Sequence, residues 1–370
     1  MDFGLNEQQE MMQTLAREFL SSEYPEKVLR ATVKDEKGFT PELWKKMAVT
    51  NLLGLSIPEE YGGVGDFLDL IIVLEEMGKA CFISPFFSTI VLGAGAVMEA
   101  GNSEQKRQYL PEIIEGKTVM TLALAETAAQ YTEDEIKLTA VSHGGFYSLN
   151  GTKIFAPYAH AADYIICAAR TGHNNKEGGI TLFVVDGKSP GLTGKVMQTL
   201  SGDKQCEVTF KNVKASVKDI LGEVNRGWKH IEKVLLRANV ALCAEMVGLA
   251  EQALKITLDY AKERTAFGHP IGAFQSIQHR CADMLIDVEG SKYAAYQAAW
   301  RINEGLPAER ETAIAKAWTG RACRRVMRSA HQVHGAIGFT EDHILHHYTK
   351  QAGAAEYSFG DVNSQLEKIA

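Results

Sequence analysis

The spacing of apolar residues changes twice along the chain, from helical to strand-like and back to helical. In the first third, Leu70, Val73 and Met77 recur at intervals of three and four and mark one face of an amphipathic helix. A further helix is predicted over residues 105–114, and Gly116 follows it as a stop signal. This part of the chain is therefore expected to be helical.

Alternating and β-rich runs replace the helical pattern between about residues 118 and 222. Residues 146–149 and 152–155 flank the pair Asn150–Gly151, and Asn-Gly between two such runs is a strong hairpin signal. A small β domain is expected in this region. Further short strands are predicted at residues 164–167, 180–185 and 207–210.

Helical periodicity returns near Gly227 and continues toward the C-terminus. An apolar stripe runs from Leu242 to Tyr260 in steps of three and four. Two more long periodic segments cover residues 275–301 and 310–334. Four long helices within roughly 140 residues are expected to pack as an antiparallel bundle.

The predicted fold class is therefore α+β and mostly α. Three consecutive domains are expected: an N-terminal helical domain of residues 1–116, a middle small β domain of residues 117–223, and a C-terminal four-helix bundle of residues 224–370. A chain of 370 residues is long enough for two or three such units, each with its own core.

Composition and charge exclude several classes of protein. A formal charge of -7, with Lys and Arg scattered, offers no footprint for nucleic acid. No apolar run is long enough for a membrane span, and the N-terminus lacks the basic and apolar parts of a signal peptide. The 6 cysteines form no CxxC pair, which predicts buried free thiols in a reducing compartment and a cytoplasmic location. The 11 histidines show no metal-ligand spacing with a carboxylate, so no metal is expected.

The most specific motif lies between two predicted long helices. One helix ends near Arg264, a turn with Phe267 and Gly268 follows, and the next helix begins near Gln275. An arginine pairs a diphosphate with two parallel hydrogen bonds, and an aromatic ring covers a nucleoside. A capped helix with an exposed arginine is the alternative that this segment alone leaves open.

A second motif, Gln332-Val-His-Gly335-Ala336-Ile-Gly-Phe339, reads as a Gly-rich loop after a long helix. Together the two motifs resemble those of the acyl-CoA dehydrogenase family, with Ala336 where the family usually has a second glycine. Weaker family landmarks occur in the same order at residues 57–63, 74–78, 104–111 and 149–153.

The resemblance implies bound FAD and assigns its contacts. Arg264 is expected to meet the pyrophosphate, and Phe267 and Gln275 to pack against and hydrogen-bond the dinucleotide. The loop residues Gln332, Gly335 and Ala336 are expected to approach the FAD of a neighbouring subunit. Two further positions differ from the family pattern: Phe155 replaces the tryptophan that commonly shields the flavin ring, and Pro157 replaces a threonine.

The family's catalytic base is missing from both of its usual positions. The reaction needs a carboxylate to remove the weakly acidic α-proton of the acyl thioester. Phe359 occupies the position near the C-terminus, and Ala238 occupies the alternative position on a helix. The backbone N–H of Phe359 remains compatible with binding the thioester oxygen. Three acids are possible substitutes: Asp361, for which cofactor contact is favoured instead, Glu245, two helical turns beyond Ala238, and Glu126.

The leading hypothesis is an FAD-dependent acyl-CoA dehydrogenase, or a subunit of one, that forms an α,β-enoyl-CoA from a bulky, branched or dicarboxylic acyl-CoA. The resemblance implies an electron-transfer flavoprotein as partner and a homo- or heterotetramer. Arg237 is a candidate for the substrate carboxylate or the CoA phosphate, with a surface-helix arginine as the alternative. Two other functions stay open: a lyase acting at the β-carbon with FAD retained, and a non-catalytic partner subunit that completes another chain's FAD site.

Overall fold

The computed structural model of the chain describes residues 4–172 and 179–370. These residues form two compact units that do not follow chain order. The helical unit comprises the described part of Met1–Ala31 together with Phe67–Phe82 and Asn239–Ala370, and the sheet unit comprises Thr32–Asp66 and Ile83–Ala238. The predicted order of helices, sheet and helices along the chain is confirmed, while the three domain boundaries stay predictions.

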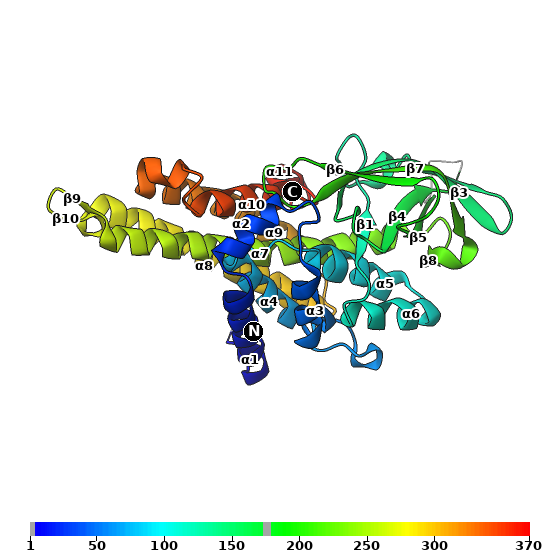
Figure 1. Cartoon of the computed structure of the whole chain (residues 1–370), viewed down its shortest axis with the longest axis horizontal. Coiled ribbons are helices and arrows are strands. Elements are labelled where there is room, and N and C mark those ends of the chain that lie inside the picture. The colour runs from blue at the N-terminus through cyan, green and yellow to red at the C-terminus, as the bar shows by residue number, and fades with distance from the viewer. Residues whose placement is uncertain (1–3, 173–178) are drawn as a thin grey trace. The chain divides into compact units, whose positions relative to one another are not determined.

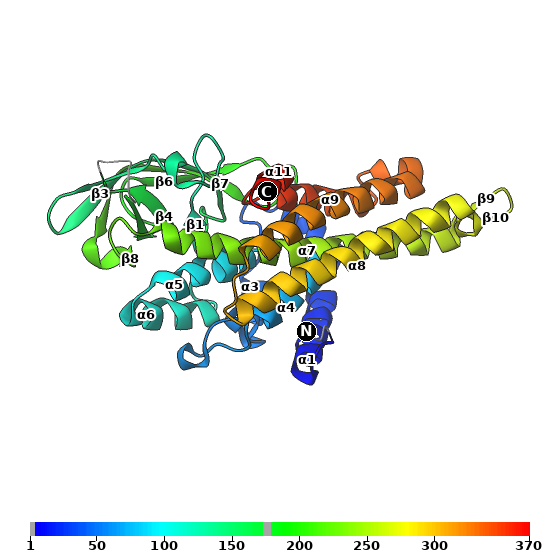
Figure 2. The ribbon, with the colours of Figure 1, turned by 180° about the vertical axis from the view of Figure 1, so that it is seen from behind.

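Long helices dominate the helical unit. Figures 1 and 2 show α7 and α8 running side by side to the short β9–β10 hairpin that joins them. Helices α7, α8 and α9 have 36, 29 and 26 residues, whereas α10, in place of the predicted fourth long helix, has 13. The elements are α1 (Glu7–Glu23), α2 (Glu26–Lys34), α4 (Phe67–Lys79), α7 (Trp228–Glu263), β9 (Thr265–Ala266), β10 (His269–Pro270), α8 (Gln275–Asn303), α9 (Glu309–His334), α10 (Leu345–Tyr357) and α11 (Val362–Glu367), with α2 and α7 continuing into the sheet unit.

Helices α4 and α7 touch through two glycines. A Cβ atom on Gly248 of α7 would lie 1.9 Å from the backbone oxygen of Glu75, and one on Gly78 of α4 would lie 2.1 Å from the backbone oxygen of Glu245. Any larger residue at either position would force the two backbones apart. Glycine is therefore required here by close approach and not by backbone conformation.

The same crossing buries a carboxylate. Glu75 is fully buried and accepts hydrogen bonds from Lys292 Nζ (2.9 Å) and Tyr296 Oη (3.0 Å) of α8, and it pairs with Lys79 Nζ at 3.1 Å. Burial favours the neutral acid, but the ammonium groups of Lys292 and Lys79 outweigh burial and lower the pKa of Glu75. A buried charge is tolerated when it is paired and hydrogen-bonded in this way.

The sheet unit is built on one mixed sheet, visible in Figure 1 as a layer of cyan and green strands. Its described strands run in the order β6-β7-β3-β2-β4-β5-β8, and β1 pairs with β4 in parallel. The strands are β1 (Met120–Ala123), β2 (Thr139–Ser142), β3 (Phe146–Pro157), β4 (Tyr164–Arg170), β5 (Ile180–Asp186), β6 (Leu192–Met197), β7 (Gln205–Ser216) and β8 (Ile220–Leu221). Its helices are α3 (Pro41–Val49), α5 (Gly95–Ala100) and α6 (Ser103–Ile114), with a π-helix over Phe87–Ala94.

The predicted hairpin turn at Asn150–Gly151 is wrong. These residues lie inside the continuous strand β3, which pairs with β7 and shifts register between Leu149 and Gly151. Gly151 has a φ of 147°, and a Cβ there would lie 2.9 Å from the Cα of Leu138. The glycine therefore serves a bulge and a close backbone approach, not a turn. The real turn lies between β2 and β3.

Other expectations from the sequence hold. All 6 cysteines are buried free thiols, as predicted. The predicted helix at residues 105–114 is α6, which begins with a capping box between Asn102 and Gln105. Among the helices in the described residues, none is both long and apolar enough to cross a membrane.

The glycine contact between α4 and α7 generates a stability prediction. Gly248→Ala should lower the free energy of unfolding by about 1–3 kcal/mol or more, because the added methyl group overlaps the Glu75 carbonyl and the backbones must separate. The control is Gly353→Ala in α10, where a Cβ would meet nothing within 4 Å. That control should be neutral or stabilising by up to about 1 kcal/mol. Chemical denaturation measures both, and equal effects would contradict the role of close packing.

Candidate functional site

The turn between α7 and α8 is a small hairpin. Strand β9 pairs with β10, and the backbone N–H of Ile271 donates to the Arg264 carbonyl at 2.7 Å, which closes the base of the turn. Phe267 and Gly268 form its tip with φ of 54° and 82°. The glycine accepts this left-handed conformation without strain, and the hairpin projects Phe267 outward.

This hairpin displays a cation and an aromatic ring to solvent. Phe267 is 93 % exposed and meets Phe274 edge-on, with ring centroids 6.2 Å apart. Arg264 and Gln275 are exposed on either side of the turn, and within the described residues the Arg264 side chain has no ion-pair partner. The ring and the cation are therefore both accessible to a ligand. The arrangement fits an anionic, partly planar ligand.

The second sequence motif forms a short 3-10 helix after α9. It covers Gly335–Phe339, and Gly335 has a φ of 63° where α9 ends. Phe339 is 72 % exposed, and its ring stacks on His331 with centroids 4.6 Å apart. Gln332 and Ala336 are also exposed, so this loop offers both backbone and side chains to a partner or ligand.

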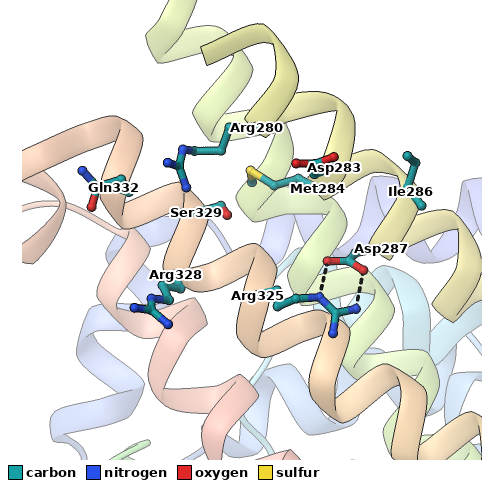
Figure 3. Close-up of a pocket in the computed structure, with 9 residues that line it drawn as sticks. All are labelled: Arg280, Asp283, Met284, Ile286, Asp287, Arg325, Arg328, Ser329 and Gln332. Atoms are coloured by element: carbon teal, nitrogen blue, oxygen red, sulfur yellow. Dashed lines mark hydrogen bonds and ion pairs between the residues drawn. The ribbon is translucent and has the colours of Figure 1, made fainter. Parts of the chain in front are cut away.

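Gln332 also lines a cavity of about 610 Å³ between α8 and α9 (Figure 3). Arg280 of α8 projects toward α9, where Ser329 and Gln332 face the same space, as Figure 3 shows. At the other end, Arg325 Nε donates to Asp287 at 2.9 Å. Charged and polar side chains share the lining with Met284 and Ile286. The lining residues are Arg280, Asp283, Met284, Ile286, Asp287, Arg325, Arg328, Ser329 and Gln332.

In the sheet unit, Phe155 stands out by its conformation. It lies in β3 where the register with β7 shifts between Lys153 and Ala156, has a φ of 52°, and is 43 % exposed. Two residues on, the carbonyl of Pro157 accepts a hydrogen bond from Thr121 Oγ1 at 2.6 Å. The bulge thus turns an aromatic side chain out of the strand while the neighbouring backbone is held.

The segment Ser358–Asp361 links α10 to α11 and is called the Phe359 turn below. Phe359 has a φ of 56° and Gly360 a φ of 107°. Asp361 caps α11, because its Oδ1 accepts the backbone N–H of Ser364 at 2.9 Å. A left-handed phenylalanine is strained, and such strain persists where the surroundings over-determine the conformation.

Comparison with known proteins assigns the family. The acyl-CoA dehydrogenase C-terminal domain profile matches residues 225–370, the N-terminal profile residues 6–117, and the middle-domain profile residues 121–213. The chain belongs to the acyl-CoA dehydrogenase family. Members of this family are FAD-binding flavoproteins.

Individual relatives cover nearly the whole chain. The Caffeyl-CoA reductase-Etf complex subunit CarC of Acetobacterium woodii is 31% identical over 91% of this chain and 90% of its own length. Butyryl-CoA dehydrogenase from Megasphaera elsdenii has a TM-score of 0.93 and 30% identity, covering 100% of this chain and 98% of that one. A chain of the ChsE4-ChsE5 complex from Mycobacterium tuberculosis has a TM-score of 0.91 and 28% identity, with coverage of 100% and 98%.

As an acyl-CoA dehydrogenase, the chain lacks an acid at both positions where the resemblance places the catalytic base. Phe359 lies in its turn, and Ala238 is fully buried on α7. The FAD assignments of Arg264, Phe267, Gln275, Gln332, Gly335, Ala336, Phe155 and Asp361 remain predictions that the surface positions above permit.

Two of the three substitute acids are committed to structural contacts. Glu126 is buried and accepts from Lys153 Nζ at 2.7 Å and from the backbone N–H groups of Lys137 and Leu138 at 3.0 Å each. Asp361 holds its helix cap. Each carboxylate therefore uses one of its oxygens in a structural interaction.

The third acid, Glu245, has a different environment. Within the described part of the chain, its carboxylate has no hydrogen-bond or ion-pair partner. Glu245 is half-buried, and desolvation of its carboxylate raises the pKa of Glu245 to about 8. A carboxyl group whose pKa lies near neutrality suits general base catalysis, although structural groups are perturbed in the same way.

Arg237, the predicted substrate ligand, lies in the sheet unit and is partly buried. Its Nη2 is 3.5 Å from the Ser56 hydroxyl oxygen, and burial lowers its pKa. Arg237 is therefore more enclosed than an ordinary arginine on a helix surface. Its substrate contact stays a prediction.

Sequence reasoning missed Lys316. It lies on α9 in the run Ala313-Ile-Ala-Lys316-Ala317, is fully buried, and donates to three carbonyls beside the Phe359 turn. The available signal was a lone charge among small residues on a buried helical face. The described residues contain no group of three His, Cys, Asp or Glu side chains placed to hold a metal ion.

The raised pKa of Glu245 predicts how stability depends on pH. The carboxyl ionises near pH 4.5 when unfolded and near pH 8 when folded, so the folded state holds the extra proton between these values. This group therefore makes the protein less stable as pH rises from about 4.5 to 8. Glu245→Gln removes the penalty, so its melting temperature should exceed that of the wild type at pH 9 and match it at pH 4.5.

Thermal melts followed by circular dichroism at the two pH values measure this difference. The control is Glu263→Gln, at the exposed end of the same helix, which should show no such pH-dependent gain. A gain for Glu245→Gln of equal size at both pH values would contradict an ionisation inside the folded protein.

Proposed function

We propose that the chain is an FAD-dependent acyl-CoA dehydrogenase, or the FAD-binding subunit of one, that forms an α,β-enoyl-CoA. The observation that carries the proposal is the α7–α8 hairpin, which presents Arg264 and Phe267 on a fixed backbone in a chain of this family. Among the described residues, Arg264 has no ion-pair partner and Phe267 is 93 % exposed, so both are accessible to a ligand.

Each proposed FAD contact has a chemical basis. Arg264 would pair the pyrophosphate, and Phe267 and Gln275 would pack against and hydrogen-bond the dinucleotide. Gln332 and Ala336 would meet the FAD of a neighbouring subunit, as expected for a homo- or heterotetramer. Bound FAD would supply the acceptor for the β-hydrogen, which leaves as hydride.

The remaining FAD and substrate contacts come from other parts of the chain. Phe155 would cover the flavin ring, and Asp361 and Gly335 would contribute through their exposed sides. Arg237 would bind a carboxylate of the acyl chain or a phosphate of CoA. A bulky, branched or dicarboxylic acyl-CoA is the proposed substrate class, and an electron-transfer flavoprotein the proposed electron acceptor. The Etf complex named for the relative CarC supports this choice of acceptor.

Glu245 is the proposed base if the reaction is completed within this chain. Its carboxylate is unpaired among the described residues, and as the ionised form it accepts a proton only above its pKa of about 8. It lies seven positions beyond Ala238, about 10 Å along the same face of an α-helix. An unusually large or deeply bound acyl group would be needed to bring the α-carbon to the Glu245 carboxylate.

The second candidate is a heteromeric enzyme whose other subunit supplies the base. The absence of an acid at Phe359 and Ala238 favours it, and the relative solved as the ChsE4-ChsE5 complex is an assembly of two differently named chains. In that case this chain completes an FAD site and contributes no proton acceptor of its own.

The first prediction from the proposal concerns cofactor content. Arg264→Ala should lower FAD occupancy of the purified protein severalfold, because the diphosphate loses a bidentate partner. Visible absorbance relative to protein absorbance measures occupancy. The control is Lys262→Ala, an exposed cation in the last turn of the same helix. Wild-type occupancy in Arg264→Ala would remove this hairpin from the FAD site.

A second experiment separates the candidate functions. The purified flavoprotein is mixed without oxygen with branched, dicarboxylic and straight-chain acyl-CoA thioesters. Bleaching of the flavin absorbance by the chain alone, lost in Glu245→Gln, supports catalysis within the chain. Bleaching only after a co-purifying second chain is present supports the heteromer. Product formed without bleaching would indicate a lyase, and a chain that never carries flavin would contradict the proposal.

A further inference from the structure

The Lys316 ammonium group is fully enclosed within the helical unit. Its Nζ donates to the carbonyl oxygens of Ala355 at 2.7 Å, Glu356 at 3.2 Å and Ser358 at 3.0 Å. An ammonium has three N–H donors and no acceptor, so the three carbonyls match its full capacity. A neutral amine would leave one of these oxygens without a donor.

Two of the three carbonyls belong to the end of α10. The last turn of a helix has carbonyls without internal partners and carries partial negative charge, which a cation stabilises. Lys316 therefore caps the C-terminal end of α10 by donating to the carbonyls of Ala355 and Glu356. Arg324, which pairs with the Glu356 carboxylate, holds the same turn from outside.

The third carbonyl connects Lys316 to the Phe359 turn. The Ser358 carbonyl and the Phe359 N–H belong to one peptide group, and a cation on the oxygen draws electrons from the nitrogen. The N–H of that peptide thereby becomes a stronger donor. The next peptide is also held, since Asn239 Nδ2 lies 3.5 Å from the Phe359 carbonyl oxygen. Both peptide groups of the left-handed Phe359 are thus restrained from inside the helical unit.

We propose that Lys316 is a positioning residue for the acyl-CoA reaction. It holds and polarises the Ser358–Phe359 peptide, so that the turn stabilises negative charge on the thioester oxygen when the α-proton leaves. The inference rests on the proposed function and adds to it a residue that acts through the backbone. It explains how the turn keeps a catalytic task although its side chain is a phenyl group.

The surroundings of Lys316 show why its charge is sensitive to pH. Burial lowers the pKa of Lys316 to about 8, and the nearby Cys243 of α7, Glu356 of α10 and Asp361 of the turn act in the opposite direction. Below that pH the ammonium is present and can polarise the peptide. Above it the group becomes neutral, and polarisation should be lost.

The test uses acetoacetyl-CoA, whose enolate carries the charge that the thioester develops on losing its α-proton. The FAD-loaded protein, with its co-purifying chain if there is one, is titrated with this thioester, and enolate binding is followed by absorbance. Lys316→Met should bind the enolate about tenfold more weakly than the wild type, less than the 10²–10³-fold lost with a whole oxyanion donor. FAD content and melting temperature are measured on the same samples.

The matched control is Lys292→Met, which removes a half-buried lysine of the helical unit that contacts Glu75 and not the turn. It should lose stability and keep wild-type enolate affinity. Folded, FAD-loaded Lys316→Met with wild-type enolate affinity would overturn the inference. A wild type that binds FAD but no acetoacetyl-CoA would overturn the proposed function, and the inference with it.

A second route covers failure of Lys316→Met to fold. Lys316→Gln keeps amide donors without charge, and its enolate affinity should also fall. In the wild type, enolate affinity corrected for ionisation of the free thioester should weaken as pH rises through about 8. Cys243→Ala should retain this pH dependence, which separates the lysine from the neighbouring thiol. A flat profile in the wild type would contradict the proposal.

Discussion

The contact between α4 and α7 is the constraint on which the helical unit depends. Because Gly78 and Gly248 bring the backbones into direct contact, Glu75 on the same turn of α4 is enclosed and cannot reach water. Its charge must then be compensated from inside, and Lys292 and Tyr296 of α8 do this. A packing requirement between two helices thus becomes an electrostatic requirement on a third. The glycine contacts hold α4 against α7, and the Glu75 carboxylate links α4 to α8.

The same crossing explains why Glu245 is so perturbed. Its backbone oxygen lies where a Cβ of Gly78 would stand, so its side chain begins at the tightest point between the helices. Unlike Glu75, it has no cation to compensate its charge among the described residues, and its pKa rises where that of Glu75 falls. Two glutamates at one helix crossing therefore behave oppositely. The difference lies in the cations beside Glu75, Lys292 of α8 and Lys79 of α4, and not in the depth of burial alone.

Periodicity predicted the helices and most strands because amphipathic spacing is a local property. The motifs at Arg264 and Gln332 were recognised because their residues resemble those of the acyl-CoA dehydrogenase family, and their FAD contacts stay predictions. The hairpin prediction at Asn150–Gly151 failed because the same dipeptide also suits a bulge. The pairing of β3 with β7 and the approach of Leu138, neither of which the dipeptide reveals, distinguish the two. Lys316 was invisible for a similar reason. Its partners are carbonyls of Ala355, Glu356 and Ser358, and backbone acceptors leave no mark in a sequence.

The Phe359 turn shows that the two tasks of a catalytic segment can separate. A side chain that accepts a proton and a backbone that stabilises an oxyanion occupy one residue in the family pattern, yet they depend on different parts of the structure. A single substitution is enough to remove the proton-accepting side chain. The backbone task needs a left-handed residue, the glycine after it, the Asp361 cap and a buried ammonium, all of which are in place here. Retaining four interacting features around a strained phenylalanine costs stability that a turn without function could relieve. These features support the proposal that the turn meets a ligand while a group outside it removes the proton.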